Sequence, residues 1–342
     1  MKVAVFGFGY WAVNVVRALC RLLPPGDIRV AEPVLERREA AERAFPGVRA
    51  EAGLEPALGD PAVGAVFVCV PSGMHFETAS RALEAGKSVF VEKPFTVNAR
   101  EAALLFECAR ANSRVAYPGH VFLHTRLFDH LREVLQSGEL GALRYAVSLR
   151  ASLGPRARED VNVVWDYLIH DVYIFNRLLG GPPLNVSARG RAYLREGVED
   201  VSFALLEYPG GFLINCYTSW HAPEKIRSLL LVGSQAMLQH AGTDGDPVRH
   251  FRAGFAPHAG RDPHGNAGLR LFDEGVRTVP LGPGEEPLQR EISAFLKLAS
   301  ENMQPAWVER HVVEVAATLE AIDRSIAQNG ARVEVAAQGV SR

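Results

Sequence analysis

The sequence predicts an α/β protein with an N-terminal doubly wound parallel sheet and a C-terminal α+β domain whose large open sheet is mostly antiparallel. Residues 1–118 alternate short β-branched runs with longer helical patterns, which is typical of βαβ units. Residues 119–342 hold longer runs in which apolar and polar residues alternate, which favours antiparallel strands with one solvated face. We place the domain boundary after Pro118, where Tyr117-Pro118-Gly119 interrupts the first pattern.

The first domain is expected to contain five parallel strands. These are Lys2–Phe6, Asp27–Ala31, Ala65–Cys69, Ser88–Glu92 and Arg114–Tyr117. Between them, helices are predicted from the helical spacing of apolar residues over Tyr10–Leu23, Phe76–Glu84 and Asn98–Ala111. Asn98 is the expected N-cap of the last of these helices, because its side chain can accept a free backbone N–H.

The second domain is expected to combine six strands with four helices. The strands are Leu143–Ala151, Leu184–Tyr193, Val201–Tyr208, Phe212–Trp220, Ile226–Val232 and Ala236–His240. The helices are Phe122–Gln136, Val164–Leu179, Leu288–Ser300 and Val308–Gln328. Pro209-Gly210-Gly211 predicts a hairpin, and Ala241–Gly284 is interpreted as loop with edge strands because its periodicity is weak.

Composition favours a cytoplasmic enzyme. The 342 residues are 48% hydrophobic and 22% charged, with a net charge of −2, so no strong positive field would attract nucleic acid. No run of about 18 apolar residues predicts a membrane span. The N-terminal apolar run continues into a glycine turn, which does not resemble a signal peptide. The four cysteines are widely spaced and are expected to be reduced.

Gly7-Phe8-Gly9-Tyr10-Trp11-Ala12 lies between the first predicted strand and the first predicted helix. Glycines at this point allow a sharp turn and let a pyrophosphate approach the N-terminus of the helix. Ala12 replaces the third glycine, which the dinucleotide fingerprint of Rossmann domains tolerates because this position needs only a small residue. The segment therefore predicts a dinucleotide cofactor.

Glu32 ends the second predicted strand, about 20 residues beyond the glycine turn, where an acid binds the ribose 2′-hydroxyl and repels a 2′-phosphate. We therefore expect NAD rather than NADP. Arg37 and Arg38 follow closely and leave NADP open as the alternative.

Two further motifs connect the chain to a known family. The first is Glu92-Lys93-Pro94, preceded by Pro71-x-x-x-His75 and by Ala82-Leu83-x-Ala85-Gly86-Lys87. The second is Trp165-Asp166-Tyr167-Leu168-Ile169-His170-Asp171, which is similar to a D-x-G-x-H-D segment. Together they resemble the glucose–fructose oxidoreductase, inositol dehydrogenase and rhizopine-catabolism (Gfo/Idh/MocA) family of nicotinamide-dependent enzymes. Gly9-Tyr10-Trp11, Trp220-x-x-Pro223-x-Lys225-x-Arg227 and Val232-Gly233-Ser234 are similar to a subgroup that acts on nucleotide-linked amino sugars.

The resemblance implies the site residues. The expected cofactor-binding residues are Gly7, Phe8, Gly9, Tyr10, Trp11, Glu32, Arg37, Pro71, His75, Glu92 and Lys93. The expected substrate-binding residues are Lys93, His120, His124, Asp166, His170, Trp220 and Lys225. Lys225 or Arg227 would meet a diphosphate if the substrate is nucleotide-linked. Leu168, at the family's usual glycine position, is expected to narrow the pocket, and the free face of the second sheet is expected to pack against a second copy in a homodimer or homotetramer.

The residues themselves also indicate catalysis by Lys93, Asp166 and His170. Lys93 follows a parallel strand, where ligands of open α/β sheets bind. Asp166 and His170 are four residues apart, so on a helix they share one face. A histidine titrates near working pH and is the best base for a secondary alcohol, while Lys93 would stabilise the developing alkoxide charge and Asp166 would orient the substrate.

Two other functions stay open. One is an NADP-linked reductase of a ketone or cyclic substrate, with Arg37 or Arg38 at the 2′-phosphate. The other is a dinucleotide-sensing regulator, which the three proton-transfer residues and the absence of a basic patch speak against. No metal site is predicted, since the spacing of His240, His250, His258 and His264 matches no ligand pattern.

Overall fold

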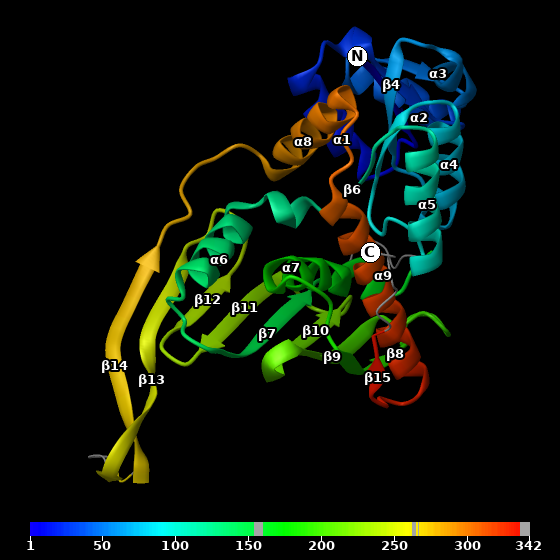
Figure 1. Cartoon of the computed structure of the whole chain (residues 1–342). Helices are drawn as coiled ribbons and strands as arrows, with labels where there is room; N and C mark the ends of the chain where they lie inside the picture. The colour runs from blue at the N-terminus through cyan, green and yellow to red at the C-terminus, as the bar shows by residue number, and fades with distance from the viewer. Residues whose placement is uncertain (154–159, 262–264, 266, 336–342) are drawn as a thin grey trace. The chain divides into compact units, whose positions relative to one another are not determined.

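The computed structural model describes residues 1–153, 160–261, 265 and 267–335, which form two compact units (Figure 1). The first unit contains residues 1–124 and 285–317, and the second contains residues 125–284 and the described chain from 318 onward. This division differs from the predicted boundaries, because a segment near the C-terminus folds with the N-terminal unit. No helix in the described part of the chain is long and apolar enough to cross a membrane.

The first unit contains a six-stranded parallel sheet in the order β3-β2-β1-β4-β5-β6, which confirms the predicted doubly wound arrangement. Its strands are β1 (Lys2–Phe6), β2 (Ile28–Ala31), β3 (Arg49–Glu51), β4 (Val63–Val68), β5 (Ser88–Val91) and β6 (Ala116–Pro118). The chain runs outward from β1 in both directions. The carboxyl ends of β1 and β4 therefore flank the switch point, where open α/β sheets bind their ligands.

Helices cover both faces of this sheet (Figure 1). They are α1 (Ala12–Leu22), α2 (Leu35–Ala44), α3 (Glu55–Gly59), α4 (His75–Glu84), α5 (Ala99–Ala111) and α8 (Pro287–Glu301), with 3₁₀ turns η1 (Pro25–Asp27), η2 (Ser72–Met74) and η3 (Val121–His124). Asn98 is confirmed as the N-cap of α5, since its side chain accepts the Glu101 N–H at 2.7 Å. The sequence did not predict α2, because Ala41 alone of its residues is buried and its apolar periodicity is weak.

Aromatic packing explains why α8 folds with the first unit. Phe295 of α8 is fully buried, and its ring meets Phe67 of β4 edge-on at 5.3 Å. The same ring lies 5.7 Å from Phe90 of β5. Burying such a side chain contributes about 1.5–3 kcal/mol. An ion pair between Arg17 of α1 and Glu286, at 2.5 Å, holds the start of α8.

The second unit contains a nine-stranded sheet in the order β14-β13-β12-β11-β7-β10-β9-β8-β15. Its strands are β7 (Leu143–Ala151), β8 (Asn185–Arg191), β9 (Val201–Tyr208), β10 (Phe212–Ser219), β11 (Ile226–Gly233), β12 (Met237–Ala241), β13 (Val248–Arg261), β14 (Ala267–Val279) and β15 (Val333–Glu334). β7 and β10 are parallel and the other pairs are antiparallel, as predicted for most of the sheet. The 3₁₀ turn η5 (Pro209–Gly211) joins β9 to β10 at the predicted hairpin.

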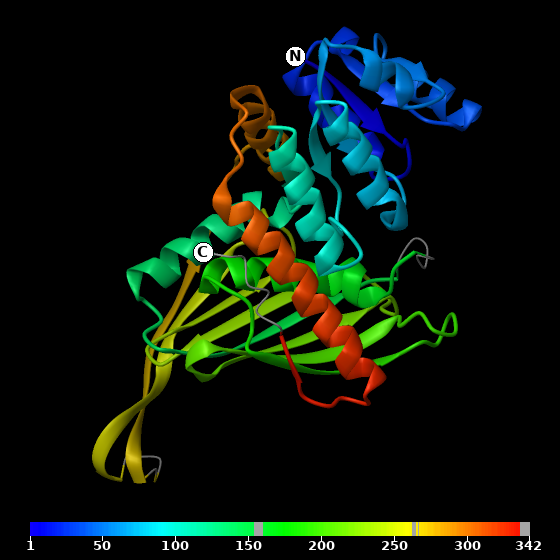
Figure 2. The ribbon, with the colours of Figure 1, turned by 45° about the vertical axis from the view of Figure 1, so that its right-hand side comes forward.

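The long ribbon of β13 and β14 is the largest difference from the predicted elements. We expected loop with edge strands over Ala241–Gly284, and β13 and β14 do pair at the edge of the sheet, but they are long and extend beyond it (Figure 2). Most of their side chains are exposed on both faces, so the sequence shows no alternation of apolar and polar residues. Backbone pairing rather than burial defines these strands.

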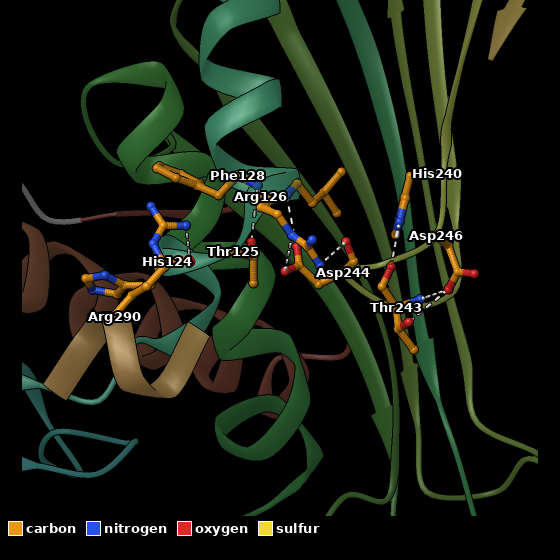
Figure 3. A network of polar contacts seen from close by, with 10 residues as sticks. His124, Thr125, Arg126, Phe128, His240, Thr243, Asp244, Asp246 and Arg290 are labelled. Atoms are coloured by element: carbon orange, nitrogen blue, oxygen red, sulfur yellow. Dashed lines mark hydrogen bonds and ion pairs between the residues drawn. The ribbon is translucent and has the colours of Figure 1, made fainter. Parts of the chain in front are cut away.

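Helices of the second unit pack on one face of its sheet (Figures 1 and 2). They are α6 (Arg126–Ser137), a π-helical turn η4 (Val164–Leu168), α7 (Ile169–Leu179) and the second half of α9 (Ala306–Ala327). The helix predicted over Phe122–Gln136 is interrupted, since η3 ends at His124 and α6 begins after Thr125. The Thr125 hydroxyl accepts the Phe128 N–H at 3.2 Å, and Asp244 accepts the Leu127 N–H at 3.0 Å (Figure 3).

Candidate active site

The glycine turn after β1 leaves room in front of the N-terminus of α1. Gly7 has a φ of 90°, and a Cβ there would lie 2.7 Å from the carbonyl oxygen of Cys69, so only glycine fits. A Cβ on Gly9 would meet nothing within 4 Å. The first turn of α1 has no acidic residue and no side-chain cap. These features fit a pyrophosphate, which open backbone and a positive helix end would hold.

Glu32 lies at the end of β2, beside this turn. Its side chain is almost fully buried, and its two oxygens accept the N–H groups of Phe8 at 2.7 Å and Val34 at 3.0 Å. Arg37 is exposed, and its guanidinium lies 3.9 Å from the Glu32 carboxylate. Arg38 donates to the carbonyl oxygens of Glu32 and Pro33, at 2.8 Å each. The structure therefore fixes a carboxylate at the position where the fingerprint expects one.

Trp11, Glu92 and Lys93 come together at the carboxyl end of β5. The Trp11 indole N–H donates to Glu92 Oε1 at 2.6 Å, and the Lys93 backbone N–H donates to Glu92 Oε2 at 3.3 Å. Tyr10 is exposed, whereas Phe8 is buried and packs edge-on against Phe45. Phe8 is therefore part of the interior of the first unit, whereas Tyr10 faces solvent.

His75, the first residue of α4, connects the ends of β4 and β5. Its ring is 1% exposed, with Nδ1 2.7 Å from the carbonyl oxygen of Pro94 and Nε2 2.9 Å from that of Val70. Carbonyl oxygens only accept hydrogen bonds, so a protonated ring nitrogen donates to the carbonyl that it faces. Both ring nitrogens face backbone carbonyls. Pro71 directly precedes the 3₁₀ turn η2, which leads to His75. His75 thus holds the Val70–Pro71 turn against the Lys93–Pro94 turn.

The two histidines that follow β6 have different surroundings. His120 is buried, and its ring lies edge-on to His311 at 5.5 Å. Burial, followed by the charges of His311 and His124, lowers the pKa of His120 well below its ordinary value, so the ring is neutral at neutral pH. The Nε2 atom of His124 lies 3.3 Å from the Tyr117 hydroxyl, and Arg290 donates to the His124 carbonyl at 2.6 Å (Figure 3).

In the second unit, Asp166 lies in the π-helical turn η4, a conformation that is frequent at functional sites. The side chain of Asn162 caps this turn by accepting the N–H groups of Val164 and Trp165. The buried Trp220, just after β10, donates its indole N–H to Asp166 Oδ2 at 3.1 Å. Asp166 and Trp220 are therefore brought together, and the indole orients the carboxylate.

His170 lies in the first turn of α7, directly after η4. Its Nδ1 is 3.0 Å from the hydroxyl of Tyr173, whose side chain is fully buried. A fixed partner at one ring nitrogen orients the other for proton transfer. Leu168 is fully buried. That it narrows the substrate pocket stays a prediction.

Sequence reasoning missed several polar residues near η4 and α7. The hydroxyl groups of Ser152 and Tyr167 lie 2.6 Å apart, and Arg150 donates to Asp171 at 2.8 Å. Arg150 lies on the buried face of β7, where alternation would place an apolar residue. An arginine at a position where the alternation calls for an apolar residue is the signal by which the sequence could have identified Arg150. Arg227 lies near the start of β11 and Lys225 directly precedes this strand; both were predicted, and Lys225 is exposed.

No group of three metal-ligating side chains occurs among the residues that the structure describes. His240 contacts the Thr243 carbonyl at 3.0 Å, whereas His250 lies between His130 at 2.8 Å and Glu139 at 3.1 Å. His258 is exposed on β13, and His264 lies outside the described residues.

Both parts of the chain match models of one protein family. Residues 1–120 match the NAD-binding Rossmann-fold model of an oxidoreductase family, GFO_IDH_MocA, and residues 128–239 match the model of the GFO/IDH/MocA C-terminal domain.

Curated relatives include enzymes named for sugar nucleotides and inositol 2-dehydrogenases. A UDP-N-acetylglucosamine 3-dehydrogenase of Acidithiobacillus ferrooxidans is 32% identical over 83% of this chain and 80% of its own length. A dTDP-3,4-didehydro-2,6-dideoxy-alpha-D-glucose 3-reductase of Saccharopolyspora spinosa is 30% identical over 62% of this chain. The matched part spans 66% of that reductase and 55% of a second one, from Streptomyces violaceoruber.

Solved structures share the fold over nearly the whole chain. A levoglucosan dehydrogenase in complex with NADH and levoglucosan has a TM-score of 0.79, at 18% identity, and covers 98% of this chain and 99% of its own. A 3-ketoreductase from Actinomadura kijaniata, in complex with TDP-benzene and NADP, has a TM-score of 0.78 at 20% identity. It covers 95% of this chain and 97% of its own.

Proposed function

The chain belongs to the GFO/IDH/MocA oxidoreductase family, and from that premise we propose that it is an NAD(P)-dependent dehydrogenase that oxidises a secondary alcohol of a sugar or sugar derivative. The observation that carries the proposal is the pair of oriented polar groups around η4: Asp166 held by Trp220, and His170 held by Tyr173. A carboxylate and an imidazole with fixed orientations suit substrate binding and proton transfer at a hydroxyl group.

The glycine turn and Glu32 would hold the dinucleotide, the former at the pyrophosphate and the latter at the ribose. When bound, the nicotinamide supplies the hydride acceptor that no side chain provides. We propose NAD as the preferred cofactor, because the Glu32 carboxylate would repel a 2′-phosphate. The exposed Arg37 keeps NADP as the alternative, and the NADP in the ketoreductase of A. kijaniata shows that a protein of this fold can bind it.

The chain's own residues would then handle the proton and the charge on oxygen. His170 accepts the hydroxyl proton, with its ring held through Nδ1 by Tyr173. Asp166 binds a neighbouring hydroxyl group of the sugar. Lys93 stabilises the negative charge that develops on the reacting oxygen, and its backbone is held by Glu92 and by the His75 contact with Pro94.

We also propose a homo-oligomer that forms through the sheet of the second unit. On the face away from the helices, β7, β9 and β10 expose apolar side chains: Tyr145, Val147, Phe203, Leu205 and Leu213. Patches of this kind mark interaction sites, and a second copy of the chain is the partner we assign to this patch.

A cytoplasmic location is supported by the cysteines, all four of which are free thiols.

The proposal is tested by NADH or NADPH formation from a panel of UDP-amino sugars, their uronates, free hexoses and inositols. We expect turnover on at least one member, faster with NAD than with NADP. Ketone analogues with NADH and NADPH test the reductase alternative in the same assay. Tight dinucleotide binding without turnover in either direction would contradict the proposal and favour a sensor.

A further inference from the structure

One asparagine holds the turn η4, which carries Asp166. The side-chain oxygen of Asn162 accepts the N–H groups of Val164 at 3.1 Å and Trp165 at 3.2 Å. The backbone carbonyl of Asn162 accepts the N–H of Asp166 itself, at 3.1 Å. Three successive N–H groups of the turn therefore point at one residue, so the position of Asn162 determines where the backbone of Asp166 lies.

Two carboxylates in turn fix the side chain of Asn162. Its Nδ2 atom donates to Glu199 Oε2 and to Asp323 Oδ1, at 3.0 Å each. Glu199 lies between β8 and β9, and Asp323 lies in the second half of α9. Ionised carboxylates only accept hydrogen bonds, so the amide nitrogen must face the two acids and the amide oxygen must face η4. Both donors and both acceptor positions of this amide group are thus used.

The second oxygen of Asp323 holds the residue next to Asp166. Asp323 Oδ2 accepts the indole N–H of Trp165 at 2.5 Å, and Trp165 is buried. Burial raises the pKa of Asp323, and the hydrogen bonds from Trp165 and Asn162 counteract that shift because they favour the charged form. Keeping a carboxylate in this partly buried place beside Glu199 costs free energy, which the two N–H groups offset.

We propose that Asn162 and Asp323 are positioning residues for the proposed reaction. Asp323 holds Asn162 and Trp165 in place, and these two residues fix the backbone of η4. The turn then presents the Asp166 carboxylate to the indole N–H of Trp220, at 3.1 Å. An acid of α9 thereby sets the orientation of the carboxylate that binds the sugar, without touching the substrate. This inference rests on the proposed function, which assigns Asp166 to substrate binding.

The variant Asp323→Asn keeps the shape of the side chain and removes one of its two acceptor oxygens. The new amide group can accept from Trp165 or from Asn162, and it places an N–H group against the other. We expect kcat/KM for the best sugar substrate to fall by about 10–100-fold, because a misplacement of about 1 Å costs up to about 10²-fold. The dinucleotide Kd should stay unchanged, since the glycine turn and Glu32 lie in the other unit. Asp273→Asn, at an exposed position of β14, is the matched control.

Fluorine NMR of the full-length protein labelled with 5-fluorotryptophan reports on the position of Asp166 without substrate. The chain contains four tryptophans, and the variants Trp165→Phe and Trp220→Phe identify two of the signals. We expect Asp323→Asn to shift the Trp165 signal by direct contact and the Trp220 signal through Asp166. An acid that served only the packing of α9 would shift the first signal and leave the second. The other two tryptophans lie in the first unit, so their signals should stay in place and show that the fold is intact.

If Asp323→Asn does not fold and all four signals move, Trp165→Phe makes the same test. It keeps an aromatic ring in the interior and removes only the N–H that Asp323 accepts. The Trp220 signal should again shift, and kcat/KM should fall by about tenfold, since a hydrogen bond to a charged group contributes that much.

A Trp220 signal that keeps its wild-type position in the folded variant would overturn the inference, and so would an active variant with the wild-type kcat/KM. The two proposals fail separately, because the NMR signal does not depend on turnover. A protein that oxidises nothing, and whose Trp220 signal shifts in Asp323→Asn, contradicts the proposed function alone. A protein that oxidises sugars equally well with and without the Asp323 carboxylate contradicts the positioning role alone.

Discussion

At the scale of single residues, Glu32 carries the proposed choice of cofactor. Its carboxylate accepts the N–H groups of Phe8 and Val34, so it is fixed at the end of β2. Glu32→Gln keeps the size of the side chain and removes the charge. We expect the preference for NAD over NADP, expressed as the ratio of kcat/KM values, to fall by about tenfold, or about 1.4 kcal/mol.

The control for this change is Glu36→Gln, which removes an exposed acid from the first turn of α2. It should leave the ratio unchanged. If Glu32→Gln and Glu36→Gln give the same ratio as the wild type, Glu32 serves only to connect the glycine turn with β2.

The part of the candidate site that could be predicted from the sequence consists of residues in short local motifs. Lys93, Asp166 and His170 lie in short segments whose spacing indicates chemistry before any fold is known. Arg150 and Tyr173 were missed as site residues, because their importance depends on the register of β7 with β11 and on the packing of α7. The ring nitrogens of His75 face two backbone carbonyls, a contact that no spacing reveals, and the place of His75 near the nicotinamide stays a prediction.

At the scale of elements, α8 contains a buried acid with a consequence for stability. Glu291 is fully buried, and burial followed by the charge of Glu92 raises its pKa well above the ordinary value of 4.5. The folded protein therefore keeps a proton that the unfolded chain releases above about pH 4.5. The contribution of Glu291 to stability is complete below that pH and is lost as the pH rises through the raised pKa.

Glu291→Gln stays uncharged at every pH, so it should not share this loss. We expect the urea midpoint of the variant, relative to the wild type, to rise steadily as the pH increases above about 4.5. Glu301→Gln, at the exposed end of α8, is the matched control. Parallel pH profiles for the wild type and Glu291→Gln would show that Glu291 is not protonated in the folded state.

Elements with a buried face were predictable, and elements without one were not. The bounds of β7 and β9 agree with the sequence prediction because their residues alternate between a buried and an exposed face. The ribbon of β13 and β14 has no such alternation, and α2 buries a single residue. The interruption at Thr125 was missed because apolar periodicity continues through η3 and hides the N-cap.

At the scale of the whole molecule, the exposed apolar face of the second sheet predicts self-association. Light scattering at micromolar concentration should give a mass two or four times that of the chain. Phe203 is 56% exposed on this face and stacks on Tyr217 at 5.0 Å. Phe203→Asp should shift the protein toward the monomer, because it places a charge in the proposed interface.

Leu35→Asp is the control for that experiment, since Leu35 is similarly exposed, on α2 of the first unit. A wild-type monomer, or an oligomer that Phe203→Asp leaves intact, would show that this sheet face is not the interface.

The proposed function makes His170 the base that takes the proton from a sugar hydroxyl. The most direct measurement compares kcat of the wild type and of His170→Ala on the best substrate of the panel, with the dinucleotide Kd measured in parallel. We predict a fall in kcat of about 10²–10⁴-fold with an unchanged Kd, while His258→Ala, an exposed histidine of β13, keeps the wild-type rate. A His170→Ala variant with wild-type kcat would show that His170 is not the base.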